Sequence, residues 1–158
     1  MTSVAETIAT NVVATIAAIP AFAAPTAGGC TRSWSAGQDL KKLPQAIVFC
    51  RDETKERGPF PAFSCRITFE VHLIDGPESA SDATWETHID GLIRSVEKAL
   101  MADPGRGLGA NSGVDTFPTR SSRYLVLDEP GENLENIAGV LFVDVTYRHD
   151  WKDPEVSV

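Results

Sequence analysis

The stretch that decides the fold is Phe63-Ser-Cys-Arg-Ile-Thr-Phe-Glu-Val-His-Leu73. Apolar and polar side chains alternate along it without interruption. Because successive side chains of a β-strand point to opposite faces of the sheet, this pattern is typical of a strand with one buried and one polar face. The sequence therefore predicts one long strand here.

A second apolar pattern, with helical spacing, follows this strand. Its residues recur every three or four positions and form one stripe along a helix: Trp85, Ile89, Leu92, Ile93, Val96 and Leu100. Asp103-Pro104-Gly105 ends the helix, because proline and glycine oppose its continuation. Burying each large apolar side chain is worth about 1.5–3 kcal/mol. We expect the strand and the helix to pack together as the centre of the core.

Length and composition indicate one globular domain over residues 1–158. The hydrophobic share of 42% and the charged share of 23% are ordinary for such a domain. The net charge of −8 argues against a protein that grips DNA, since phosphate binding needs an excess of basic side chains. It does not exclude a surface past which DNA slides.

Cysteine usage favours a reducing compartment. The three cysteines, Cys30, Cys50 and Cys65, cannot all pair within the chain. Cys65 lies on the apolar face of the long strand and Cys50 ends an apolar run, so both are predicted to be small buried thiols. No apolar run approaches the length needed to cross a bilayer, so no membrane partner is expected.

The N-terminal segment has two interpretations. Val4, Ile8, Val12 and Ile16 recur every four residues until Pro20, as in an amphipathic first helix. The alternative is a secretory signal, because small residues of the cleavage type follow. The segment before the apolar stretch contains no lysine or arginine and carries an acidic residue instead, which favours the helix.

The remaining chain predicts three more strands and several loops. The strands are expected at Gln45–Cys50, Tyr124–Leu127 and Ala138–Trp151, and the connecting loops and turns at Pro25–Gly37, Arg51–Gly58, Gly105–Ser122 and Asp128–Asn136. The element order is then α-β-β-α-β-β. We predict an α+β fold: a mostly antiparallel four-stranded sheet with two main helices on one face.

A search for chemistry finds no catalytic constellation. Gly105-Arg-Gly-Leu-Gly109 follows a helix and lacks the Gly-Lys-Ser/Thr of a phosphate-binding loop. His72, His88 and His149 are scattered without zinc-type spacing and are predicted to be exposed surface histidines. Cys30 has only Arg32 near it in sequence. We predict no catalytic residue, no metal ligand and no cofactor.

The polar strand faces suggest assembly instead. Arg66 and Glu70 on the long strand, with Asp144 and Arg148 on the last strand, offer charge complementarity to a neighbouring subunit. A plain solvated sheet face is the alternative interpretation of the same residues.

Several stretches together resemble one family: Leu43-Pro-Gln-Ala-Ile-Val-Phe49, Cys65-Arg-Ile-Thr-Phe-Glu-Val71, Ala99-Leu-Met-Ala-Asp-Pro104, Gly107-Leu-Gly-Ala110 and Val140-Leu-Phe-Val-Asp-Val-Thr-Tyr-Arg-His-Asp150. With the N-terminal helix before them and a Trp/Asp-Pro tail after them, they cover most of the chain. In this order they resemble tail terminator (tail completion) proteins of long-tailed bacteriophages and related phage-like particles.

This resemblance implies a non-enzymatic virion protein, made in the host cytoplasm. Its copies would form a ring, typically hexameric, on the head-proximal end of the tail tube, stopping tube growth and joining the tail to the neck or head connector. DNA would pass through the lumen without specific binding, and an acidic lumen would keep it from adsorbing. The charged turn and the glycine-rich loop are then candidate contacts with the tube or neck, through Arg51, Asp52, Glu53, Lys55, Arg57 and Arg106.

Three other functions fit the same sequence. Another phage neck or minor tail protein could carry a similar helix, loop and final strand. A secreted or periplasmic binding module would require removal of the N-terminal segment. A small enzyme would have to use Cys30 or the histidines.

Overall fold

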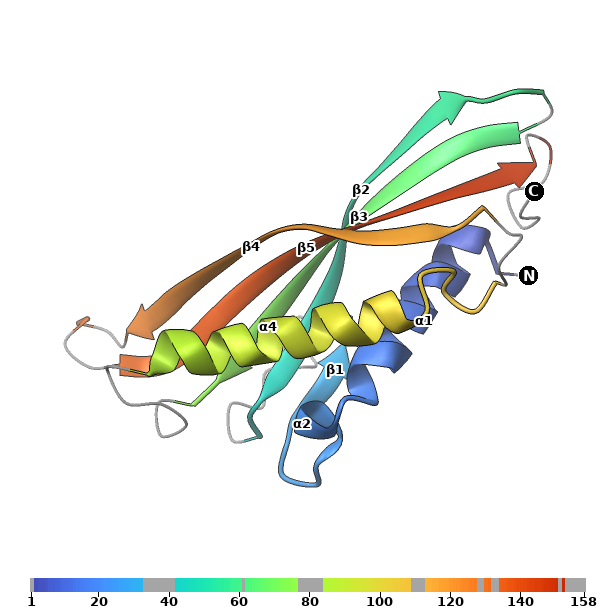
Figure 1. The fold of residues 1–158 in the computed structure, drawn as a ribbon. Coiled ribbons are helices and arrows are strands. Elements are labelled where there is room, and N and C mark those ends of the chain that lie inside the picture. Colours follow the sequence, from blue (N-terminus) through green and yellow to red (C-terminus); the bar gives the residue numbers. More distant parts are fainter. Residues whose placement is uncertain are drawn as a thin grey trace.

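The chain folds as one curved sheet with helices packed on one of its faces (Figure 1). The computed structural model describes residues 2–32, 42–60, 62–76, 84–108, 113–127, 130–131, 134–150 and 152. The α+β class is confirmed, but the sheet has five strands rather than four and is mixed rather than purely antiparallel.

The five strands follow the order β1-β2-β3-β5-β4 across the sheet. The short β1 pairs in parallel with β2, and every other neighbouring pair is antiparallel. The long strands β3 and β5 therefore occupy the interior of the sheet. The strands are β1 (Gly29–Thr31), β2 (Gln45–Arg57), β3 (Ala62–Asp75), β4 (Asp115–Leu127) and β5 (Leu134–Asp150).

All four predicted loops and turns are wrong in part because they contain strand residues, and the expected turn Asp128–Asn136 overlaps the start of β5 at Leu134. Arg51–Arg57, expected as a charged turn, continues β2 and stays paired with β3 as far as Phe63. The second half of the expected loop Gly105–Ser122 belongs to β4, and β1 lies within the expected loop Pro25–Gly37. Both long extensions are exposed, so their side chains show no apolar alternation although their backbones are paired.

The helices begin and end close to the expected positions. Helix α1 (Val4–Ala17) starts at Ser3, whose hydroxyl accepts a hydrogen bond from the Glu6 backbone N–H at 3.2 Å. Pro20 does not simply stop the pattern but begins the short helix α2 (Pro20–Ala23). Helix α4 (Trp85–Ala102) carries the predicted apolar stripe.

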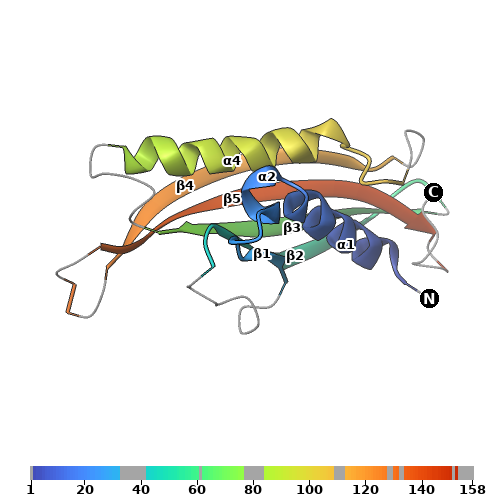
Figure 2. The same cartoon turned by 90° about the horizontal axis from the view of Figure 1, so that it is seen from below.

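One hydrophobic core lies between the helices and the sheet (Figure 2). The alternation in β3 is confirmed, since its apolar side chains from Cys65 to Leu73 are buried. The core also takes the stripes of α1 and α4 and alternate residues of β5, among them Ile8, Val12, Ile89, Val96, Leu141 and Val143. None of the described helices combines the length and hydrophobicity that crossing a membrane requires.

Arg106 is not a surface contact, contrary to the sequence-based expectation. Only 1% of it is exposed, and its guanidinium donates to the backbone carbonyls of Leu100 and Asp103 at the end of α4. It also donates to Asn11 Oδ1 of α1 at 3.3 Å. The last carbonyls of a helix lack partners within the helix and carry its negative dipole end, so a cation is favourable there. Arg106 therefore joins α4 to α1.

Candidate functional site

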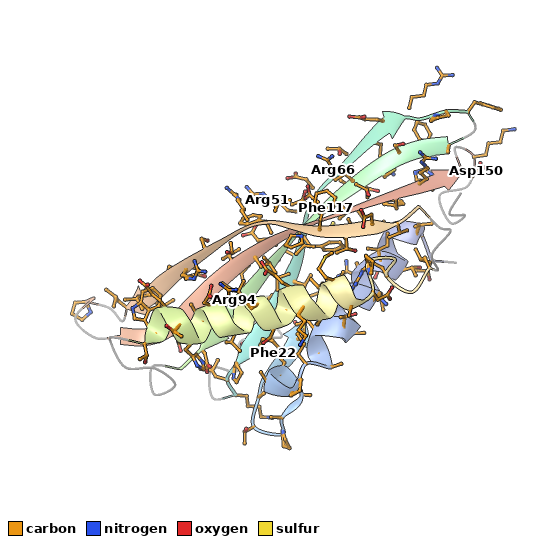
Figure 3. The ribbon with its side chains drawn as sticks, viewed as in Figure 1. Phe22, Arg51, Arg66, Arg94, Phe117 and Asp150 are labelled. Atoms are coloured by element: carbon orange, nitrogen blue, oxygen red, sulfur yellow. The ribbon has the colours of Figure 1, made fainter. Side chains whose placement is uncertain are left out.

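The polar face of the sheet is the one turned away from the helices. The strand register places polar residues of β2, β3, β5 and β4 side by side on it. Figure 3 shows Arg51 and Arg66 among the strands, apart from Arg94 on α4 and Phe22 on α2. We call this surface the open face and define it by these residues: Arg51, Asp52, Thr54, Glu56, Ser64, Arg66, Thr68, Glu70, His72, Asp115, Phe117, Arg120, Phe142, Asp144, Thr146 and Arg148.

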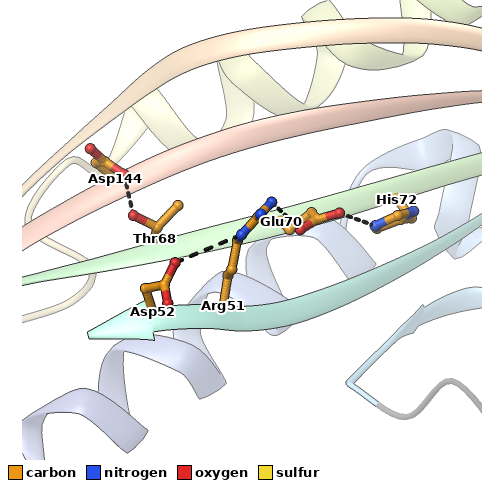
Figure 4. Close-up of polar contacts among 6 residues, drawn as sticks. All are labelled: Arg51, Asp52, Thr68, Glu70, His72 and Asp144. Atoms are coloured by element: carbon orange, nitrogen blue, oxygen red, sulfur yellow. Dashed lines mark hydrogen bonds and ion pairs between the residues drawn. The ribbon is translucent and has the colours of Figure 1, made fainter. Parts of the chain in front are cut away.

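A chain of charged side chains crosses the middle of the open face (Figure 4). Arg51 Nη1 lies 3.2 Å from Glu70 Oε2, and Glu70 Oε1 lies 2.7 Å from His72 Nε2. Arg51 Nε also lies 3.7 Å from Asp52 Oδ2. The register of β2 shifts between Cys50 and Asp52, and Arg51 is the extra residue. Such a bulge redirects a side chain, and here it brings Arg51 over β3.

A second set of polar contacts joins β3 to β5. The Thr68 hydroxyl donates to Asp144 Oδ1 at 2.7 Å. Arg66 Nε lies 3.9 Å from Asp144 Oδ2, so this ion pair is long. Asp144 is the more buried partner, with 13% of its side chain exposed against 56% for Arg66. The hydrogen bond from Thr68 therefore fixes the carboxylate, and the guanidinium stays largely in solvent.

Two aromatic side chains complete the centre of the open face. The Arg120 guanidinium lies 4.0 Å from the centre of the Phe142 ring, and the Arg51 guanidinium lies 5.6 Å from it. Phe49 packs edge-on against His72, with the ring centres 5.2 Å apart. The Phe142 ring therefore holds the Arg120 guanidinium on the sheet and adds to the ion pairs that Arg51 makes with Glu70 and Asp52.

The structure brings together six of the ten predicted contact residues and separates the other four. Arg51, Asp52, Arg66, Glu70, Asp144 and Arg148 share the open face. Glu53, Lys55 and Arg57 belong to the opposite face of β2, since they are paired with Ile67, Cys65 and Phe63. Arg106 is buried, as described above.

Glu53 lies at the edge of the core. Its carboxylate accepts a hydrogen bond from the Tyr147 hydroxyl, and Lys55 Nζ lies 3.6 Å from it. Burial, together with this hydrogen bond, raises the pKa of Tyr147 well above its ordinary value. Glu53 and Tyr147 thus join β2 to β5 across β3.

Three open-face residues were not among the contact residues predicted from the sequence. Arg120 fell in a stretch assigned to a loop, and His72 was read as a simple exposed histidine. Phe142 was seen only as part of an apolar start to the last strand. An arginine opposite an aromatic side chain on a neighbouring strand, as Arg120 is opposite Phe142, could have indicated this contact. It can be recognised only when the register of the two strands is known.

The histidines and cysteines differ from expectation in part. His149 is buried, with its Nδ1 2.7 Å from the Asp150 carbonyl oxygen, and His88 Nε2 lies 2.6 Å from Asp75 Oδ2. Cys65 is buried as predicted, whereas Cys50 is exposed because it lies where β2 leaves the core. Burial raises the pKa of Cys30 to about 12, which makes that thiol a poor nucleophile.

Comparison with known proteins identifies no family for this chain. No model of a protein family matches the chain, and a search of curated proteins finds no match. Within the described residues, no group of three or more histidine, cysteine and acidic side chains is arranged to hold a metal ion. The open face is a surface of ion pairs and cation–aromatic contacts.

Proposed function

We propose that this protein is a ring-forming structural component of a phage or phage-like particle, a tail terminator. In this proposal the ring, typically hexameric in the family that the chain resembles, caps the head-proximal end of the tail tube and joins it to the neck or head connector. One observation carries the proposal: among the described strands, the sheet has an unpaired edge on each side, and the two edges are complementary in direction.

The first unpaired edge is the outer half of β2. The parallel strand β1 pairs only with Gln45–Ile47 of β2. From Val48 to Arg57, no strand among the described residues pairs with that side of β2. An edge of this length presents a row of backbone donors and acceptors to another strand.

The second unpaired edge is β4 on the opposite side of the sheet. Among the described strands, β4 pairs only with β5. Its last residues are apolar and exposed: 38% of Tyr124, 42% of Leu125 and 51% of Leu127 are accessible to solvent. Exposed apolar side chains on an edge strand favour pairing with another chain.

The strand directions allow these two edges to meet. Strands β2, β3, β5 and β4 alternate in direction, so β4 runs opposite to β2. If β4 of one copy lay beside β2 of the next copy in the same orientation, the pair would be antiparallel. The contact would be head-to-tail between different surfaces, and contacts of this kind generate closed rings when the rotation between copies closes and open filaments when it does not.

The open face bears on the proposed passage of DNA. Its cations are Arg51, Arg66, Arg120 and Arg148, and its carboxylates are Asp52, Glu56, Glu70, Asp115 and Asp144. The face is thus close to balanced, and the net charge of −8 resides mostly elsewhere. If this face lined the lumen, balance rather than strong repulsion would keep DNA from adsorbing.

Solution mass and cross-linking test the proposal. We expect light scattering and negative-stain images to find rings of several copies, either free or on tail tubes. Thr54→Cys on β2 and Ser122→Cys on β4, in a Cys50→Ser background, should be joined between copies by a short bismaleimide. Thr54→Cys combined with Thr10→Cys on α1 is the matched control and should give no ladder. A chain that stays monomeric with and without tubes would contradict the proposal.

A further inference from the structure

A pocket lies at the outer end of the open face, toward the hairpin that joins β2 to β3. Its volume is about 360 Å³. Six open-face residues line it from three neighbouring strands: Thr54, Glu56, Ser64, Arg66, Thr146 and Arg148. All six belong to one chain, so the pocket exists without any ring.

The strand register arranges these six side chains in two rows. Glu56 on β2 is opposite Ser64 on β3, which is opposite Arg148 on β5. In the next row on the same face, Thr54 is opposite Arg66, which is opposite Thr146. The two arginines are therefore diagonal neighbours on adjacent strands, close enough to act on one ligand.

The donors of this pocket are largely unused. Arg66 makes only the long 3.9 Å contact with Asp144. Among the described residues, Arg148 has no hydrogen bond or ion pair, and the hydroxyls of Thr54, Ser64 and Thr146 make no hydrogen bond. Two arginines and three residues with hydroxyl groups thus line one shared hollow.

We propose that this pocket binds the phosphate group of a small phosphomonoester. Arginine matches phosphate oxygens with paired N–H donors, and hydroxyls supply further donors. A phosphate group accepts more hydrogen bonds than a carboxylate does, because it has three or more oxygens rather than two. The volume exceeds that of a phosphate ion and leaves room for the organic part. Glu56 opposes the anion and so limits its affinity.

Calorimetric titration in low-salt, phosphate-free buffer tests this site with inorganic phosphate and ribose 5-phosphate as probes. We expect saturable binding of both, tighter for ribose 5-phosphate. Arg66→Gln and Arg148→Gln should each weaken binding at least tenfold. Glu56→Gln should strengthen it severalfold, because it removes the one negative charge that lines the pocket. Arg94→Gln is the matched control, since Arg94 is an exposed arginine paired with Asp90 on α4.

The possible results of these titrations distinguish the parts of the proposal. Equal affinity for the two probes would support the phosphate site and would contradict the part of the proposal in which the pocket also binds the organic group. Absence of saturable binding to the wild-type chain would overturn the proposal. So would binding that both Arg66→Gln and Arg148→Gln leave unchanged while their circular dichroism matches the wild type. None of these outcomes depends on ring formation.

Discussion

At the scale of single residues, Arg106 shows how a charge that looks like a surface feature becomes structural. It follows a helix in a glycine-rich segment, which in sequence is typical of an exposed loop. In the structure its backbone has φ 52°, and the side chain turns back onto the last carbonyls of α4. Burial lowers the pKa of its guanidinium from the ordinary value, yet the group stays charged at any ordinary pH.

Replacing Arg106 should destabilise the fold. Arg106→Met keeps the length of the side chain but leaves the buried Leu100 carbonyl without its side-chain donor and removes one of the two donors to the Asp103 carbonyl. Losing hydrogen bonds from a charged donor costs about 3 kcal/mol. Urea denaturation measures the free energy of unfolding. The control Arg94→Met, at an exposed i,i+4 pair, should change it by about 0.5 kcal/mol or less. Equal effects of the two substitutions would refute the structural role of Arg106.

Tyr147 predicts how the free energy of unfolding depends on pH. Burial and the hydrogen bond to Glu53 raise its pKa in the folded chain above the ordinary value near ~10. The folded state therefore holds this proton more tightly, so the associated stability is present below about pH 10 and is lost as the pH rises further. Tyr147→Phe should cost about 1 kcal/mol at pH 8.

The difference between wild type and Tyr147→Phe should then shrink at alkaline pH, because phenylalanine has no proton to lose. Urea titrations at pH 8 and at a pH above the ordinary tyrosine value provide the two free energies of unfolding. Tyr124→Phe is the comparison at the chain's other tyrosine, which is more exposed. A difference that stays constant across this range would count against the assignment.

At the scale of elements, apolar periodicity predicted the segments that bury a face in the core. It missed the exposed segments that only backbone pairing holds in the sheet. The strand β3 and the helix α4 were both predicted because each turns a regular apolar face to the core. The side chains of the outer half of β2 and of most of β4 are exposed, although Arg123 of β4 is paired with Asp90 of α4. Backbone pairing holds these segments, and backbone hydrogen bonds leave no mark in the sequence.

The packing of α4 on β5 has a sharp test at Gly139. A Cβ at this position would lie 3.1 Å from Ile89 Cγ1 and from Ile93 Cδ1, both buried on α4. Gly139→Ala should therefore force α4 and β5 apart and cost about 1–3 kcal/mol in the free energy of unfolding.

Gly91 on the exposed side of α4 is the matched control. A Cβ there would meet nothing within 4 Å. Gly91→Ala should stabilise the chain by about 0.5–1 kcal/mol, because glycine in a helix interior loses more backbone freedom on folding than alanine does. Thermal and urea unfolding of the two variants should thus shift in opposite directions. A shared direction would show that α4 does not pack on β5 as described.

At the scale of the whole molecule, the candidate site depends on neighbours that sequence order separates. Arg66, Glu70, Asp144 and Arg148 were predicted on the polar faces of two strands, and the register of β3 with β5 places them on one face of the sheet. Arg120 could not be added before β4 was known to be a strand. The pocket of Thr54 and Arg148 likewise needs β2, β3 and β5 in register.

The proposed ring depends on the edge strand β4, whose exposed apolar side chains contribute little to the stability of a single copy. Leu125 and Leu127 at the end of β4 are 42% and 51% exposed, so lysine at either position should leave the free energy of unfolding nearly unchanged. In a ring built by β4 on β2, the same lysines would place charge against the neighbouring subunit. Leu125→Lys and Leu127→Lys should therefore reduce ring assembly strongly while the monomer stays folded.

Phe60→Lys supplies the control for these edge substitutions. Phe60 is 78% exposed but lies in the turn between β2 and β3, away from the edge strand β4. Light scattering and negative-stain images, with and without tail tubes, should find rings for Phe60→Lys and chiefly monomers for the two β4 variants. If all three assemble like the wild type, the edge of β4 is not an assembly surface, and the argument from strand direction fails with it.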